Sequence, residues 1–302
     1  MLFFTIWPLF ALIGLGFWLA RSGFPHPDFW VGAEKLTYFI FFPALLFTSL
    51  SRAPLSDPAL ARMGAAAVAT ILVAAGGLWL ARRMRPTPAA RFGPAFQGVV
   101  RFNTYLGFAV IGSLGGAEAV GRAAVYLAIA VPLVNLLSIL ALTEAGPARR
   151  PVALLKTIFG NPLILACIGG FAVALTGFGL PYGTGSFLDL LARASLPLGL
   201  LCVGAALQPA ALRRDLLVLA GNTVLRLFGM PMLAWLVALA FGLDAGTALV
   251  LVVFSAVSTA PTSYVLTRQL GGDGALMAGL VTCQTLSAAI TIPLVLMIFA
   301  PG

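Results

Sequence analysis

The sequence predicts an all-helical protein that crosses a lipid bilayer ten times, in two halves of five spans each. Hydrophobic residues make up 61% of the chain and charged residues only 9%, whereas a soluble domain has about half and a quarter. Apolar stretches of about twenty residues recur along the whole chain, and each can cross the hydrocarbon core as a helix. Short motifs of the first half also recur in the second. These observations indicate a polytopic membrane protein built from a repeat.

Apolar runs, read against Gly, Pro and charged breaks, place the ten expected spans. They lie near residues 3–20, 35–51, 59–81, 95–114, 122–142, 154–175, 187–207, 215–241, 246–267 and 275–299. The first is interpreted as a span because it lacks the basic region and cleavage site of a signal peptide. The most polar interruptions are 82–91 and 144–151, and no hydrophilic stretch is long enough for a soluble domain.

The positive residues are distributed unequally between the two sides. The loops after spans 1, 3, 5, 7 and 9 hold twelve of them: Arg21, Lys35, Arg82, Arg83, Arg85, Arg91, Arg149, Arg150, Lys156, Arg213, Arg214 and Arg268. The other side holds four: Arg52, Arg62, Arg122 and Arg193. The positive-inside rule therefore predicts a bacterial inner-membrane protein with both termini on the periplasmic side. The net charge of +9 is read as a topology signal, so no nucleic-acid partner is expected.

The two halves resemble each other in order and spacing. Gly16-Phe17 recurs as Gly170-Phe171, and Pro43 recurs as Pro197. Gly23-Phe24 is matched by Gly177-Phe178, and Leu114-Gly115-Gly116 by Leu270-Gly271-Gly272. Because each half has an odd number of spans, the second half, 152–302, must be inserted upside down relative to the first, 1–143. Inverted repeats of this kind are typical of secondary transporters, whose sites lie near the midplane where helices break.

Spans 4 and 9 carry the signals of broken helices. Span 4 has Asn103, Thr104 and Gly107 at its middle, and span 9 has several hydroxyl side chains around Pro261, which removes a backbone donor. Opened backbone at this depth persists only where it is buried in protein or lines a cavity. A single Ser or Thr more simply packs within its own helix, but the two segments together predict a substrate site. The expected binding residues are Asn103, Thr104, Tyr105, Gly107, Thr259, Pro261, Thr262 and Gln284, with Pro43 either a ligand or a helix kink.

Arg226 is a permanent charge midway along the apolar stretch NTVLRLFGMPMLAWLVALAF. A guanidinium at that depth is costly and requires a partner, a cavity or a ligand. Two roles stay open: contact with an anion, or bonding to carbonyls freed by a broken neighbouring helix. Neutral donors and the positive ends of half-helices suit a carboxylate ligand.

Other chemistry has little support in the sequence. The nine acidic residues and the single histidine, His26, all fall in loops or at span ends. Cys167, Cys202 and Cys283 lie inside spans and match no zinc spacing. Ser113 lacks the preceding glycine of a nucleophile elbow. We therefore expect no metal, no cofactor and no enzymatic activity.

Six segments resemble the auxin efflux carrier family: FPALLFTSL, RFNTYLG, LPLGLLCVGAAL, LRLFGMP, APTSYVLTRQLGGDGALMAG and QTLSAAITIPL. Bacterial members of this family include proteins assigned as carriers of malonate and other carboxylates. The resemblance implies ten helices in a fold similar to sodium/proton antiporters and bile-acid symporters. A scaffold near 3–20, 35–51, 154–175 and 187–207 would form a homodimer surface. A transport domain near 59–142 and 215–299 would contain the crossed, broken helices 4 and 9.

The same resemblance assigns two residue roles. Asn103 matches the crossover asparagine that faces substrate in plant members, and Arg226 matches a basic residue of span 8. The chain departs from the plant pattern at Ala109, where plant members have proline, and the sequence leaves open which residue of span 9 is the crossover point.

Together these observations predict a secondary carrier of a small organic anion that works by an elevator-like shift of one domain against the other. One alternative is a sodium-coupled symporter of the bile-acid type, with sodium held by oxygens of Asn103, Thr259, Thr262 and Gln284. A second is a membrane sensor that binds ligand without transporting it, although no cytoplasmic output domain is visible. The sequence leaves the substrate, the direction and the coupling ion open.

Overall fold

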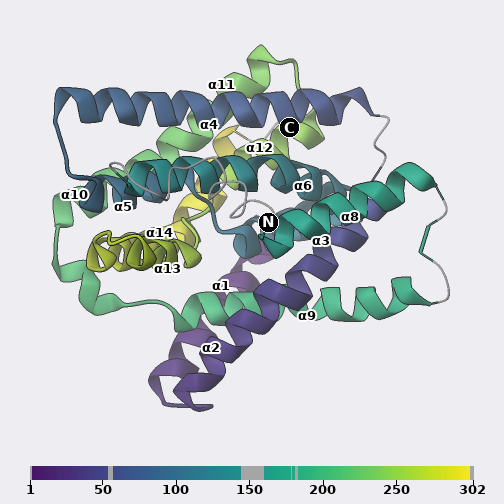
Figure 1. Cartoon of the computed structure of the whole chain (residues 1–302), viewed down its shortest axis with the longest axis horizontal. Helices are drawn as coiled ribbons and strands as arrows, with labels where there is room; N and C mark the ends of the chain where they lie inside the picture. The colour runs from purple at the N-terminus through teal and green to yellow at the C-terminus, as the bar shows by residue number, and fades with distance from the viewer. Residues whose placement is uncertain (1, 54–56, 144–159, 178, 181–182, 300–302) are drawn as a thin grey trace.

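The computed structural model describes residues 2–53, 57–143, 160–177, 179–180 and 183–299, and every regular element in these ranges is a helix (Figure 1). The first half contains α1 (Leu2–Arg21), α2 (Pro27–Leu36), η1 (Thr37–Phe41), α3 (Phe42–Ser51), α4 (Pro58–Met84), α5 (Ala89–Val100) and α6 (Thr104–Leu142). The second contains α8 (Pro162–Thr176), α9 (Thr184–Ala205), η3 (Pro209–Arg213), α10 (Leu216–Val224), η4 (Leu225–Gly229), α11 (Met230–Ala240), α12 (Ala245–Ala256), α13 (Thr262–Gln269) and α14 (Gly274–Phe299). The expected interruption at 144–151 and the start of the sixth span, 154–159, lie outside the described residues.

Seven helical segments of the described chain are long and apolar enough to cross a membrane, as expected for a polytopic membrane protein. They are Phe3–Arg21, Pro27–Ser51, Pro58–Met84, Ala89–Leu142, Thr184–Ala205, Leu216–Ala240 and Gly274–Phe299. Two shorter apolar helices, Pro162–Thr176 and Ala245–Ala256, accompany them.

The segment Ala89–Leu142 is not one straight helix. It opens between Val100 and Thr104, and it turns again at Gly116, whose φ of 61° and ψ of −152° are not helical. Only glycine adopts this backbone conformation at low cost. The segment therefore consists of three helical pieces, with the chain changing direction at the second glycine of the LGG motif.

Two long helices each contain a π-helical turn that ends two residues before a proline. In Pro27–Ser51 the turn η1 precedes Pro43, and in Leu216–Ala240 the turn η4 precedes Pro231. Proline has no N–H and its ring crowds the preceding turn, so a wider turn relieves the clash. Pro43 is thus a site of helix distortion, and Arg226 lies inside η4.

The second membrane segment begins earlier than the expected start near residue 35. α2 starts at Pro27, a favoured first helical residue, and His26 caps it by accepting from the Asp28 N–H. The earlier start places Glu34 within the helix rather than in the loop before it, and this changes the inventory of charged groups available to a binding site.

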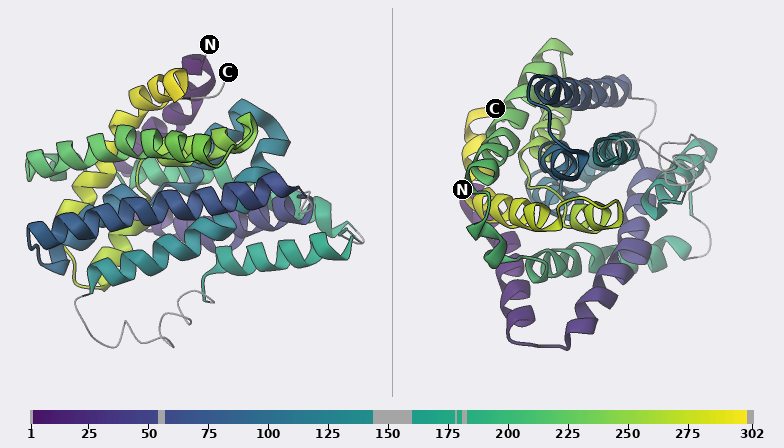
Figure 2. Two further views of the ribbon diagram at one scale, coloured as in Figure 1. Left: turned by 90° about the horizontal axis from the view of Figure 1, so that it is seen from above. Right: turned by 60° about the vertical axis from the view of Figure 1, so that its left-hand side comes forward.

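Glycines allow the closest helix contacts in α1, α3, α8 and α9. α1 crosses α9 where Gly16 lies against the Leu201 backbone and Gly204 against Ile13. α8 crosses α3 where Gly170 lies against Phe47. A Cβ at Gly16 would overlap the Leu201 carbonyl, so the two backbones touch directly, as is common between membrane helices. The start of α1 and the end of α14 lie beside each other at one end of the molecule (Figure 2).

We expect Gly16→Ala to destabilise the fold by about 1–3 kcal/mol, because the added methyl group must push two backbones apart. Gly14→Ala is the matched control, since a Cβ at Gly14 meets nothing within 4 Å. Thermal unfolding of both variants in detergent tests this. Equal melting temperatures for the two variants would contradict the described α1–α9 contact.

Candidate functional site: a cavity at two crossed, broken helices

The two broken helices meet at their breaks. α5 ends at Val100 and α12 at Ala256, and the Asn103 N–H donates to the Ser258 carbonyl at 2.8 Å. The second break begins at Val257, whose φ of −76° and ψ of 155° are extended. Pro261 therefore does not kink a continuous helix but forms the N-cap of α13, where its fixed φ suits the start of a new helix.

Arg226 satisfies the carbonyls that the two breaks expose. Its Nε donates to the Val257 carbonyl at 2.8 Å, and Nη1 donates to Val99 at 2.8 Å. Nη2 donates to Phe254 at 2.6 Å. These carbonyls lie at the C-terminal ends of α5 and α12, where unpaired acceptors and the negative helix dipole favour a cation. The side chain is 1% exposed, so the geometry gives Arg226 the carbonyl-bonding role and no contact with a ligand.

Gln284 of α14 ties the same two breaks together. Its Oε1 accepts from the Thr259 N–H at 2.9 Å, and its Nε2 donates to the Gly98 carbonyl at 2.9 Å and to Asn222 Oδ1 at 3.0 Å. The Thr259 hydroxyl donates to the Gln97 carbonyl at 3.1 Å. Both predicted site residues are fully buried, and their polar atoms serve the crossover itself.

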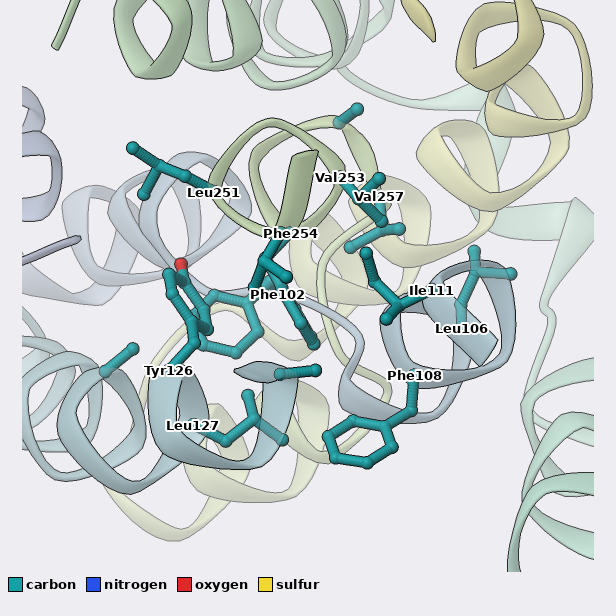
Figure 3. Packing of buried hydrophobic residues seen from close by; sticks show 14 of the residues in the cluster. Phe102, Leu106, Phe108, Ile111, Tyr126, Leu127, Leu251, Val253, Phe254 and Val257 are labelled. Carbon is teal, nitrogen blue, oxygen red and sulfur yellow. The ribbon is translucent and has the colours of Figure 1, made fainter. Parts of the chain in front are cut away.

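An aromatic cluster fills the space beside the crossover (Figure 3). Tyr126 and Phe254 stack with ring centroids 4.7 Å apart, and Phe102, from the first break, lies 5.5 Å from Phe254. Gly107 is required here, because a Cβ at that position would overlap the Phe254 ring. Gly107 is thus a packing residue that allows α6 to approach α12.

A cavity of about 50 Å³ lies at the crossover, lined in part by Phe102 of the aromatic cluster. It is larger than the roughly 10–15 Å³ that one water needs. Of the predicted binding residues, Asn103, Thr104, Tyr105, Pro261 and Thr262 line it. In the described structure, the other five predicted residues do not line the cavity: Gly107, Thr259, Gln284, Pro43 and Arg226. The sequence prediction thus mixed residues that face the cavity with residues that hold its walls together.

Three helices begin at this cavity. Asn103 caps α6, Asn161 caps α8 and Pro261 caps α13, and all three line the cavity. The first N–H groups of a helix have no partner within the helix and carry its positive dipole end. Such ends are ready-made anion sites. In addition, Asn103 Nδ2 is buried with no hydrogen-bond partner in the described structure, so a donor is available at the same place.

Arg101 adds a full positive charge to this cavity, and the sequence analysis did not select it. Its hydrogen bonds go to neutral side chains, Gln97 Oε1 at 3.3 Å and Thr262 Oγ1 at 3.5 Å. No carboxylate of the described residues forms an ion pair with it. The signal that singled out Arg226, a charge inside an apolar span, applied equally to Arg101 two residues before Asn103.

Four more polar side chains on the cavity wall were also missed: Glu34, Tyr38, Asn135 and Asn161. Glu34 was placed in a loop because the second span was expected to begin after it. Asn161 was overlooked because the α8 start lies next to the chain's polar midpoint, far in sequence from either break. Both reach the site only through the packing of α2 and α8 around the crossover.

The cavity continues into a wider vestibule of about 600 Å³. Lys35, Gly160 and Gln269 line the vestibule, and Glu34, Arg101 and Thr262 line both spaces. Next to the cavity wall at Tyr105, Phe42 packs edge-to-face on Tyr105 at 4.9 Å and on Phe108 at 5.5 Å. A separate cavity of about 820 Å³, lined by residues such as Arg52, Glu118, Arg122 and Pro197, is distinct from the first.

This combination of apolar helices, two broken helices crossing at their openings and a polar cavity at the crossing defines a polytopic membrane transport protein. A family model described as "Membrane transport protein" matches residues 147–296. The chain is also 28% identical over 219 residues, 68% of its length and 67% of the relative's, to a "Putative malonate transporter" of Rhizobium meliloti (strain 1021). These two matches support a membrane transporter of the auxin efflux carrier family.

We expect Arg226→Met to lower the free energy of unfolding by about 3 kcal/mol or more, since three buried carbonyls lose their donor at roughly 1–3 kcal/mol each. Arg214→Met, at an exposed arginine, is the control. Thermal unfolding in detergent is the measurement. A stable Arg226→Met protein would show that the carbonyls find other partners and that the breaks do not depend on this side chain.

Proposed function

We propose that this protein is a secondary carrier that moves a small carboxylate across the bacterial inner membrane. The observation that carries the proposal is the convergence of Arg101, the orphan donor of Asn103 and three helix N-termini on one cavity. Each of these groups favours negative charge. Arg101 bonds only to neutral side chains, and Asn103 Nδ2 has no hydrogen-bond partner in the described structure. Malonate, the ligand in the relative's name, is a carboxylate of suitable size for a first probe.

Ten crossings in two inverted repeats are part of this proposal. Dividing Ala89–Leu142 at Gly116 and counting α8 and the α12–α13 pair adds three crossings to the seven long segments. The contact Gly16–Leu201 corresponds to Gly170–Phe47 when each residue is exchanged for the one 154 positions away. An equivalent contact seen from both halves supports an inverted repeat better than motif similarity alone.

One pair of glycines matched between the halves also shares a positive φ. Gly23 and Gly177, which follow α1 and end α8, lie 154 positions apart and have φ of 77° and 69°. In the two LGG motifs the positive φ falls on different positions, the second glycine in one (Gly116, 61°) and the first in the other (Gly271, 74°). Positive φ at Gly23 and Gly177 supports a similar chain reversal after corresponding helices.

An elevator mechanism is supported by how the polar contacts are distributed. We assign α1, α2, α3, α8 and α9 to a scaffold, and α4–α6 with α10–α14 to a transport domain. Arg52 pairs with Asp189 at 2.8 Å within the first set. Arg122 pairs with Asp244 at 3.1 Å, and Arg226 and Gln284 bridge helices, all within the second set. Each set is thus tied together internally, as two bodies that slide past one another require. A homodimer through the scaffold completes the proposal.

The orientation follows from the charges. Gly160 and Gln269 of the vestibule flank loops on the side that carries twelve Lys and Arg residues, which the positive-inside rule places in the cytoplasm. In this orientation the termini are periplasmic and the cavity opens inward. The Phe42 contacts with Tyr105 and Phe108 would close it toward the periplasm.

The sodium-coupled alternative meets a difficulty in the same geometry. Thr259 and Gln284, two of its four oxygen donors, already accept or donate hydrogen bonds that hold the breaks. The sensor alternative differs from the carrier only in flux. Both enter the test as separate outcomes.

We expect malonate to stabilise the purified protein against heat, and Arg101→Gln and Asn103→Ala each to weaken its binding by about tenfold or more, since a charge-assisted hydrogen bond contributes roughly 1.5–3 kcal/mol. Arg193→Gln, an exposed arginine of the separate cavity, should bind as the wild type does. Thermal shift with and without sodium, followed by malonate flux into proteoliposomes, gives the answer.

Stabilisation by sodium alone would favour the symporter. Binding without flux would favour the sensor. Absence of binding by any mono- or dicarboxylate would refute the anion site.

A further inference from the structure

The cavity that collects positive groups also contains one carboxylate. Glu34 of α2 lines both the inner cavity and the vestibule, as Arg101 does. Its side chain is half-buried, and within the described residues no hydrogen bond or ion pair engages it. Glu34 and Arg101 belong to different helix sets, the proposed scaffold and the proposed transport domain. A ligand in this small space therefore meets a fixed cation and a fixed anion together.

The surroundings of Glu34 offer few groups to neutralise its charge. Besides Arg101, the titratable side chains that share the cavity are neutral in their ordinary forms: Tyr38, Tyr105 and Cys202. The charged residues of the neighbouring α9, Asp189 and Arg193, line the separate cavity instead. Lys35, the next residue on α2, is exposed and lines only the vestibule.

Two carboxylates in one partly desolvated space repel each other strongly. A single ligand carboxylate is accommodated by Arg101 and the three helix N-termini. A second ionised carboxylate on the same ligand would have to lie in the same confined volume as Glu34. A hydroxyl, an amide or a protonated carboxyl in that place would instead donate a hydrogen bond to Glu34, which is an acceptor only.

We propose that Glu34 makes this site selective for monoanions that carry one carboxylate and one neutral hydrogen-bond donor, and against dianions. The substrate class is then a hydroxycarboxylate or the singly protonated form of a short dicarboxylate. The inference rests on the proposed function, since it assumes that a carboxylate occupies the cavity. It adds that the charge of Glu34 determines which carboxylates the site binds tightly.

Three ligands of nearly the same size separate these possibilities at one alkaline pH, where malonate is a dianion. Malonamate has one carboxylate and an amide donor, and monomethyl malonate has one carboxylate and no donor. We expect wild-type protein in detergent to bind malonamate at least about tenfold more tightly than malonate, and monomethyl malonate in between, because like charges brought together without compensation reject a ligand. Isothermal titration of the full-length protein measures the three affinities.

Glu34→Gln should remove this ranking. Malonate binding should improve by about tenfold, because the repulsion is gone, and the advantage of malonamate should shrink. Glu34→Asp keeps the charge and should keep the wild-type ranking. Asp28→Asn is the matched control: it makes the same carboxylate-to-amide change on the same helix, at an exposed position outside the cavity, and should leave all three affinities unchanged.

The outcomes distinguish a failure of the Glu34 selectivity from a failure of the proposed carboxylate site. Equal wild-type affinities for malonate and malonamate would overturn the selectivity and leave the carboxylate site standing. This comparison needs only wild-type protein, so it remains decisive even if Glu34→Gln does not fold. An unchanged ranking in folded Glu34→Gln likewise overturns the role of Glu34. If none of the three ligands binds the wild type, the carboxylate site and the selectivity fail together.

Discussion

The structure depends on the three hydrogen bonds from Arg226 to the carbonyls of Val99, Phe254 and Val257. Two helices opened within a bilayer expose backbone acceptors that lipid cannot satisfy, at a cost of several kcal/mol each. One guanidinium serves both breaks because its donors are arranged in a planar fork. With these carbonyls paired, the breaks can stay open, and the Phe102, Tyr126 and Phe254 rings can pack beside them.

This arrangement divides the four helix ends at the crossover by charge. The negative ends, those of α5 and α12, are neutralised by the protein's own cation. The positive ends, those of α6 and α13, are left facing a cavity, where the start of α8 joins them. A crossover whose acceptors are paired directs the positive dipole ends of its other two helices toward the cavity. The proposed preference for an anion would then arise from the same interaction that permits the helices to break.

The sequence predicted much of this architecture because the relevant signals are local. Long apolar stretches indicate membrane helices whatever surrounds them, and Pro261 and Asn103 prevent or cap helices through their own backbone and side-chain chemistry. The positions of the breaks were therefore predicted to within a few residues. Glu34 and Asn161 could not be found in this way. One depended on where α2 begins, and the other on a helix distant in sequence packing against the crossover.

Arg101 and Arg226 show what the sequence can determine and what requires the tertiary structure. In the sequence they are equivalent: each is a permanent charge inside an apolar span, and each requires a partner or a ligand. The sequence by itself determined that both must be compensated, because the cost of burying a charge depends only on its surroundings being apolar. Only the tertiary structure decided that three carbonyls come within reach of Arg226, whereas Arg101 meets neutral side chains and a cavity. Distances between segments far apart in the chain decide which polar groups pair within the protein and which can bind a ligand.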